Sequence, residues 1–448
     1  MSDKTLIQNA RLVNEGRISD SDLLISRGRI EKIAPHIAAD GNTEVVDAAG
    51  RYLLPGMIDD QVHFREPGLT HKGGIRSESR AAAAGGITSF MEMPKTLPPT
   101  VTLDALEDKY VVAAEKSLVN YAFYLGATND NLDVIRALQP GQAAGIKIFM
   151  GASTGNMLVD NEETLAGIFR DAPALIATHC ESTPLIDANL AAALEKYGPE
   201  IPVTEHPNIR SAEACYVSTV LAQELARRYS APLHVLHLST GREMELFEPG
   251  PMADKLITAE ICVHFLHFDS SHYPSHGNRI KCNPAIKTPA DRAALLQALK
   301  DGRLDIIATD HAPHTAEEKA ATDYRKAPSG LPLVQDALLS VLELHHDGDL
   351  GLEQIVRLTA HNVADRFKVV DRGYLREGYW ADLVLVDLAA PTAATADRVL
   401  SQCGWTPFEG ETFRSSIART IVNGQTVFDG EAIVETDAAQ RLEIGSQR

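Results

Sequence analysis

The feature that most constrains the fold is a regular alternation of short apolar runs with helical stretches between Pro55 and about Arg366. The runs are nearly uninterrupted by polar residues, which is typical of parallel strands buried on both faces. Eight such βα units in succession predict an α/β fold built on a closed parallel barrel of the TIM type. The predicted strands are 56–60, 87–93, 121–126, 145–150, 174–179, 233–238, 258–265 and 305–310, and the predicted helices include 78–84, 103–117, 211–229, 289–301 and 334–345.

Short β-like runs occupy both ends of the chain. They cover 6–12, 23–25, 30–33 and 44–46 before the barrel region, and 381–386 and 418–427 after it. The last run contains Asn423-Gly424, a strong signal for a two-residue hairpin turn. We expect the two ends to pair into one small composite β domain, made of residues 1–54 and 367–448, that flanks a barrel of residues 55–366.

The overall charge is strongly acidic, because the 448-residue chain has a formal net charge of −19 and no basic stripe offsets it. This disfavours nucleic acid and anionic membranes as partners, although a few local cations can still bind an anionic metabolite. The five cysteines are scattered without a Cys-x-x-Cys pair, so neither a disulfide framework nor a cysteine zinc site is predicted. No segment has the apolar length of a signal peptide core or a membrane span, and we expect a cytoplasmic protein.

Residues able to bind metals gather at the ends of the predicted strands. His63 follows the first strand, Lys147 lies in the fourth, and His179, His237 and Asp310 end the fifth, sixth and eighth. A single polar residue at a strand end is ordinarily structural. The C-terminal strand ends of a barrel, however, converge on one mouth, which is where barrel enzymes carry their active sites. Five such residues therefore predict a metal centre, for which neutral imidazole is a common ligand.

Three of these positions have competing interpretations. His234 and His237 lie three apart, so on a regular strand they face opposite ways, and only His237 is expected to point into the barrel. Lys147 could be an ordinary edge-exposed lysine, but it lies in an apolar stretch, where a bare ammonium is costly to bury. Such a lysine can react with carbon dioxide to form an anionic carbamate that bridges two cations. Asp310 could cap the next element, or act as both metal ligand and proton acceptor.

The stretch from Asp59 to Gly68 adds a function in anion binding. Gln61, His63 and Arg65 are spaced two apart, which places them on one face of an extended strand. A guanidinium binds a carboxylate bidentately, although Arg65 could equally form a surface salt bridge. The remaining histidines are interpreted as structural or surface residues, and they include His264, His267, His272 and His276.

Taken together, these motifs resemble the cyclic amidohydrolases of the amidohydrolase superfamily, and most closely the dihydroorotases. The resemblance runs through nearly the whole chain and rests on VHFREPG, AGGITSFMEMP, GIKIFMG, ATHCE, LHVLHLST, RIKCNPAIK, IATDHAPH, GYWADLVLVD and IVNGQTV. It implies a distorted (β/α)8 barrel with a two-part β domain. It also implies a homodimer and a centre of two zinc ions (Zn2+) bridged by a carboxylated lysine.

Carried over position by position, the resemblance assigns the site residues. The metal ligands are Gln61, His63, Lys147, His179, His237 and Asp310, with Lys147 as the carbamate and Asp310 also as the catalytic proton shuttle. The residues that contact substrate are Arg65, Lys95, Asn283 and His314, together with the loop 327–330.

Two positions depart from the family pattern. Gln61 replaces the first histidine of a His-x-His pair. A neutral amide oxygen is a weaker zinc ligand than imidazole, so we expect Gln61 to bind weakly or through water. Lys95 replaces the asparagine of a Met-Pro-Asn-Thr motif. Lysine can still meet a carboxylate as a point charge, but it lacks the geometry of the amide.

The resemblance implies reversible, zinc-dependent hydrolysis of (S)-dihydroorotate to N-carbamoyl-L-aspartate, a step in pyrimidine synthesis. Allantoinase and dihydropyrimidinase (hydantoinase) are the enzymatic alternatives. Arg65 argues against both, because allantoinases typically carry Asn there and dihydropyrimidinases lack the Arg-Glu-Pro-Gly continuation. A non-catalytic scaffold for aspartate transcarbamoylase is the third alternative. The replacement at Gln61 favours the scaffold, and the presence of Lys147 and Asp310 opposes it.

Overall fold

A parallel barrel forms the centre of the computed structural model, which describes residues 4–151 and 157–447. The strands pair in chain order as β6–β7–β8 and β9 to β14, and only Tyr124 separates β8 from β9. Between β14 and β6 the barrel closes where the His63 N–H donates to the His311 carbonyl at 2.7 Å. The strands are β6 (Met57–Val62), β7 (Ile87–Glu92), β8 (Asn120–Phe123), β9 (Leu125–Gly126), β10 (Ile146–Phe149), β11 (Ile176–His179), β12 (Leu233–Val235), β13 (Ile257–Cys262) and β14 (Ile306–Ala308). The predicted (β/α)8 barrel is confirmed.

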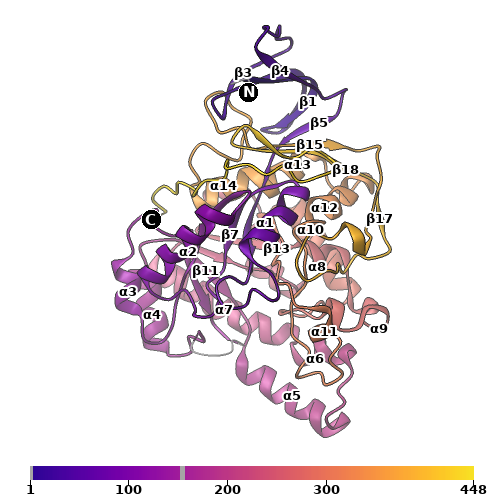
Figure 1. Cartoon of the computed structure of the whole chain (residues 1–448). Coiled ribbons are helices and arrows are strands. Elements are labelled where there is room, and N and C mark those ends of the chain that lie inside the picture. Colours follow the sequence, from indigo (N-terminus) through magenta and orange to yellow (C-terminus); the bar gives the residue numbers. More distant parts are fainter. Residues whose placement is uncertain (1–3, 152–156, 448) are drawn as a thin grey trace.

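Helices cover the outside of the barrel (Figure 1). Several of the longer ones begin at a residue whose side chain accepts a backbone N–H of the first turn, such as Thr102 before α2 and Ser211 before α7. The helices are α1 (Ile75–Ala84), α2 (Leu103–Lys116), α3 (Leu132–Ala137), α4 (Glu162–Asp171), α5 (Thr183–Tyr197), α6 (His206–Ile209), α7 (Ala212–Tyr229), α8 (Val263–His267), α9 (Tyr273–His276), α10 (Pro289–Lys300), α11 (Ala316–Lys319), α12 (Ala337–His346), α13 (Leu352–Val356) and α14 (Asn362–Phe367).

The predicted end of the seventh strand is wrong. The apolar run was expected to stay extended over 258–265, but β13 ends at Cys262 and α8 begins at Val263. Val263 and Phe265 are buried on the helix as fully as a strand would bury them. An uninterrupted apolar run therefore does not show where a buried strand passes into a buried helix.

The two chain ends form one sheet above the barrel, with the strand order β19-β18-β15-β5-β1-β2-β3 and with β4 paired to β1 (Figure 1). Asn423 and Gly424 both have positive φ, 47° and 80°, as the predicted hairpin turn requires. The composite β domain is confirmed, while its boundaries at residues 54 and 366 stay a prediction. The strands are β1 (Lys4–Asn14), β2 (Arg17–Ser26), β3 (Arg29–Ala34), β4 (Thr43–Asp47), β5 (Tyr52–Pro55), β15 (Leu383–Asp387), β18 (Ser416–Val422) and β19 (Gln425–Phe428).

A buried polar cluster joins this sheet to the barrel. Arg372 pairs with Asp382 and donates to the Asn423 side chain at 2.7 Å. Asp382 also accepts from the side chain of Asn120 in β8 at 3.1 Å. Because every member is hydrogen-bonded, the cluster fixes the sheet on the barrel without leaving a buried charge unpaired. Among the described helices, none is both long and apolar enough to cross a membrane.

Candidate active site

All ten predicted site residues line one cavity of about 420 Å³ at the C-terminal ends of the barrel strands. They are Gln61, His63, Arg65, Lys95, Lys147, His179, His237, Asn283, Asp310 and His314. The cavity is completed by Leu69, Lys72, Phe149, Arg210, Ala312, Pro328, Ser329 and Gly330. The structure thus brings the whole predicted set together, while the role of each residue stays a prediction.

Three of these residues have the left-handed backbone conformation that side chains other than glycine rarely adopt. The φ angle is 67° at Arg65, 42° at His237 and 52° at Asp310. Each such residue costs about 1–3 kcal/mol and persists only where its surroundings hold it, which is common at active sites. The backbone strain at these three residues therefore lowers the stability of the fold, and it directs their side chains into the cavity.

His179 and His237 converge on one point. Their Nδ1 and Nε2 atoms lie 2.9 Å apart, and the Glu181 carboxylate holds His179 through Nε2 at 2.9 Å. Burial lowers the pKa of both imidazoles below the usual value, which favours the neutral form that binds metals. The buried Nδ1 atom of His63 has no hydrogen-bond partner among the described residues. Converging neutral imidazoles and an unsatisfied ring nitrogen fit a metal ion.

Lys147 is buried, with 1 % of its surface exposed. In the described ranges its side chain has no hydrogen bond or ion pair, and its ammonium nitrogen lies 4.8 Å from the centre of the Phe149 ring. Burial lowers the pKa of Lys147 to about 8, although the nearby Asp310 charge acts in the opposite direction and raises it. An unpaired amine of this kind in a cavity with histidines fits carbamate formation, because the carbamate would supply anionic oxygen ligands.

Asp310 lies between the predicted ligands of the first metal. One of its oxygens, Oδ1, lies 3.2 Å from His63 Nε2 and accepts a hydrogen bond from Gln61 Nε2 at 3.1 Å. Burial raises the pKa of Asp310 to about 6, while the charges of His264, Lys147, His179 and Arg65 lower it. The amide oxygen of Gln61 lies 3.9 Å from the Cys262 thiol. Gln61 therefore acts as a hydrogen-bond donor to Asp310 here.

Arg65 presents its guanidinium to the cavity. Its Nε donates to the Pro313 carbonyl at 3.1 Å, and its Nη2 lies 3.1 Å from His314 Nε2. The Lys72 ammonium, 3.1 Å from His314 Nδ1, can only donate. Arg65 Nη2 can likewise only donate, but the Ser329 carbonyl, 3.1 Å from His314 Nε2, can only accept, so Nε2 carries the hydrogen and donates to it. Both terminal nitrogens of Arg65 then lack an oxygen acceptor in the described residues and are available to a ligand.

The other predicted substrate contacts face the same space. The amide oxygen of Asn283 is buried without a partner among the described residues. Lys95 lies 5.5 Å from the centre of the Phe149 ring, and burial lowers its pKa to about 8. Gly330 has a φ of 144°, and a Cβ there would lie 2.4 Å from the Ala312 carbonyl, so the loop can reach this position only with glycine.

Several site residues escaped the sequence analysis. Arg210 lines the cavity and clamps Glu181, which in turn holds His179. The His-x-Glu spacing of His179 and Glu181 was a usable signal, but nothing near Arg210 marks it. Lys319 donates to the carbonyls of 281, 328 and 330, each at 3.0 Å, and so fixes the substrate loop. His264, expected to be structural, is buried with both ring nitrogens unpartnered among the described residues.

The expectation that His234 points out of the barrel is wrong. His234 Nε2 lies 3.3 Å from Asp60 on β6 and 3.3 Å from Glu260 on β13. Because β6 and β12 are not neighbours, the contact with Asp60 crosses the barrel interior. Alternation fails because β12 ends at Val235, and the irregular segment that follows also turns His237 inward. Asp60, His234 and Glu260 form a buried group that could itself hold a metal ion.

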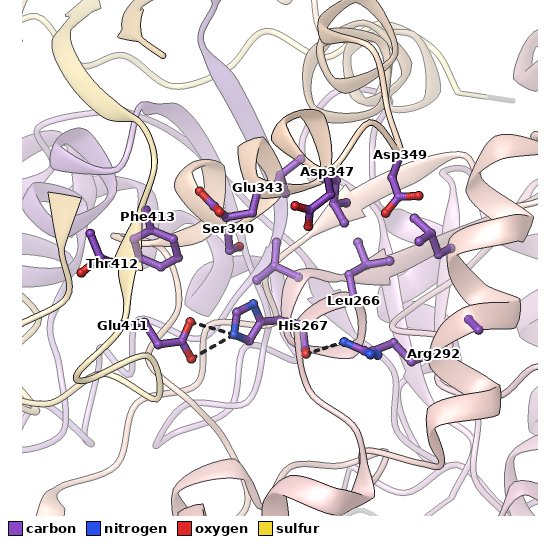
Figure 2. A pocket seen from close by; sticks show the side chains of 15 residues that line it. Leu266, His267, Arg292, Ser340, Glu343, Asp347, Asp349, Glu411, Thr412 and Phe413 are labelled. Carbon is purple, nitrogen blue, oxygen red and sulfur yellow. Dashed lines mark hydrogen bonds and ion pairs between the residues drawn. The ribbon is translucent and has the colours of Figure 1, made fainter. Parts of the chain in front are cut away.

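A second cavity, of about 430 Å³, lies outside the barrel between α8, α10, α12 and the two-residue strand β17 (Thr412–Phe413). Figure 2 shows Glu411 paired with His267 across its floor. Asp349 pairs with Lys300 at 2.6 Å, and Arg414 pairs with the carboxylates of 343 and 347 at 2.7 and 2.6 Å. Its acidic groups thus already have ion-pair partners, and we do not take it as the active site.

A barrel mouth with converging histidines, a buried lysine and a strand-end aspartate is typical of metal-dependent barrel hydrolases. Residues 52–427 match the model of the Amidohydrolase family. The chain belongs to this family.

The similar proteins hydrolyse cyclic amides. A dihydroorotase from Halobacterium salinarum is 35% identical over 95% of this chain and 98% of its own length. An allantoinase from Deinococcus radiodurans is 31% identical over 99% of each chain. The solved structure of an L-hydantoinase (dihydropyrimidinase) from Arthrobacter aurescens superposes with a TM-score of 0.93 at 27% identity, covering 99% of this chain and 100% of that one. The prediction of a cyclic amidohydrolase enzyme is confirmed.

Proposed function

We propose that the protein is a zinc-dependent dihydroorotase that interconverts (S)-dihydroorotate and N-carbamoyl-L-aspartate. One observation carries the choice of substrate. In a chain with a net charge of −19, the cavity is lined by Arg65, Lys72, Lys95 and Arg210, besides Lys147, which the proposal makes a carbamate. Lys72 and Arg210 pair with Glu318 and Glu181, whereas Arg65 and Lys95 have no carboxylate partner among the described residues. Such a site concentrates anions, and dihydroorotate carries a carboxylate, whereas allantoin and hydantoin do not.

The ligand set proposed for zinc comprises Gln61, His63, Lys147 as its carbamate, His179, His237 and Asp310. Bound zinc would supply polarisation of the amide carbonyl and activation of water. Arg65, Lys95 and Asn283 would hold the exocyclic carboxylate and so orient the ring, with His314 and the backbone of 328–330 beside it.

Asp310 would move the proton. In the hydrolytic direction its carboxylate accepts a proton from the attacking water and delivers it to the ring nitrogen that leaves. A general base works best when its pKa is near the working pH. Burial, which raises the pKa of Asp310 to about 6, supports this role. The ring-closing direction uses the same group in reverse.

The experiment is a substrate panel on one preparation, with bound zinc counted on the same sample. Dihydroorotate, allantoin and hydantoin are offered at equal concentration. We expect dihydroorotate to be hydrolysed with a kcat/KM far above that of the other two. Turnover of allantoin or hydantoin without dihydroorotate would replace the proposal by the corresponding alternative. Absence of zinc together with absence of all turnover would favour the scaffold.

A further inference from the structure

His237 is aimed by its backbone. Its ring nitrogen Nε2 lies 2.9 Å from His179 Nδ1, so it must point at the proposed metal. Its other ring nitrogen, Nδ1, is buried and has no partner among the described residues. His179 differs, because Glu181 holds its ring directly. What orients His237 must therefore act on its peptide, which has a φ of 42°.

One carboxylate binds that peptide. Glu260, on β13, accepts the His237 backbone N–H through Oε1 at 2.9 Å. The backbone carbonyl of Glu260 accepts the next N–H, that of Leu238, at 3.0 Å. The irregular segment after β12 is thus fixed to β13 at two consecutive residues, and the first of these bonds depends on a side chain.

The Glu260 side chain is itself held in place. Its Oε2 lies 3.3 Å from His234 Nε2, which also lies 3.3 Å from Asp60 on the opposite side of the barrel. His234 Nδ1 lies 2.8 Å from the Thr258 hydroxyl. All four side chains are buried, with 0% of their surface exposed. The buried group of Asp60, His234 and Glu260 is therefore connected to the His237 peptide through the Glu260 side chain.

We propose that Glu260 is a positioning residue for the metal centre. Glu260 holds the His237 peptide in its left-handed conformation, and Asp60 and His234 hold Glu260 in place. The inference rests on the proposed metal-binding roles of His179 and His237. Removing a residue that orients a metal ligand typically weakens metal binding by about 10–100-fold. Glu260 does not line the cavity.

Two substitutions separate the length of the side chain from its carboxyl group. Glu260→Asp keeps the carboxyl group but is one methylene too short to reach the His237 N–H. Glu260→Gln keeps the length and loses the carboxyl group, and its amide oxygen can accept the same N–H. The matched control is Glu243→Asp, because Glu243 is also buried but accepts from the hydroxyls of Thr219 and Thr240, at 2.7 Å each.

The readout is the affinity of the metal-free protein for Zn2+, measured by competition with a chelator and without substrate. His237→Asn serves as the reference for loss of this site, and thermal unfolding of each metal-free variant checks its fold. We expect Glu260→Asp to weaken zinc binding by about 10–100-fold. Glu260→Gln and Glu243→Asp should stay near the affinity of the unaltered protein.

Unaltered affinity in Glu260→Asp would overturn the inference, and so would a loss in Glu260→Gln as large as that in Glu260→Asp. If His237→Asn also binds zinc normally, the metal assignment itself fails and the inference falls with it. Because no substrate is used, these results do not depend on whether dihydroorotate is the substrate.

Discussion

Replacing Arg65 by glutamine tests the choice of substrate most directly. Arg65 is 7% exposed and lines the cavity, while its Nε is bound to the Pro313 carbonyl. Burial lowers the pKa of Arg65 to about 10, so it stays charged at neutral pH. Glutamine removes the charge and the planar pair of donors, but it leaves the cavity polar.

The size of the effect follows from the hydrogen bonds that are open to a ligand. Two terminal nitrogens can make two parallel hydrogen bonds to a carboxylate. Each charge-assisted bond contributes about 1.5–3 kcal/mol, which together gives about 3–6 kcal/mol. At 1.4 kcal/mol per tenfold change, the kcat/KM for dihydroorotate should fall by roughly 10²–10⁴. A neutral cyclic amide forms neither bond and should be little affected.

The assay therefore compares kcat/KM for dihydroorotate with kcat/KM for hydantoin in each variant. Arg292→Gln is the matched control, since Arg292 lines the second cavity (Figure 2). We expect the ratio of the two constants to fall by roughly 10²–10⁴ in Arg65→Gln and to stay unchanged in Arg292→Gln. A parallel loss on both substrates, which leaves the ratio unchanged, would mean that Arg65 serves the fold. No loss on either substrate would mean that Arg65 does not bind the carboxylate.

Three further changes have defined outcomes. Asp310→Asn should lower kcat by about 10²–10⁴ while zinc stays bound at His179 and His237; retained turnover with zinc present would exclude the proton-transfer role. Lys147→Met cannot form a carbamate, so zinc per chain, measured by elemental analysis, should fall, and a full zinc content would contradict the bridging role. Arg372→Met leaves the buried Asp382 charge without its cation and should lower the free energy of unfolding by about 3–5 kcal/mol in urea titrations, an effect that Arg292→Met should not reproduce.

Much of the site could be predicted because each residue lies at a recognisable place in the sequence. Lys147 lies within a short strand and His179 ends one, and His63 and Asp310 follow the ends of their strands by one and two residues. The barrel itself then makes them neighbours, since all parallel strands end at the same mouth. No pairwise contact had to be known, which is why ten dispersed residues converge on one cavity as expected.

The residues that position this set could not be found in the same way. Glu260 and Arg210 act through contacts between elements far apart in the chain, and neither follows a sequence pattern of its own. His234 was assigned to the wrong face because strand alternation was extended past Val235, where the strand ends. The positive φ at His237 is also invisible in a sequence that has no glycine there.

The two departures from the family pattern have different consequences. Gln61 still takes part in the site, because it donates to the same Asp310 oxygen that lies 3.2 Å from His63. Hydrogen bonds to a carboxylate favour its charged form, so this contact helps to keep Asp310 able to accept a proton. Lys95 adds a cation on the side where Arg65 already lies, as the lowering of its pKa by Arg65 indicates. A degraded site would lose partners at both positions. Here one replacement supports the proposed base and the other strengthens the attraction for an anion, which argues for a working hydrolase and against a scaffold.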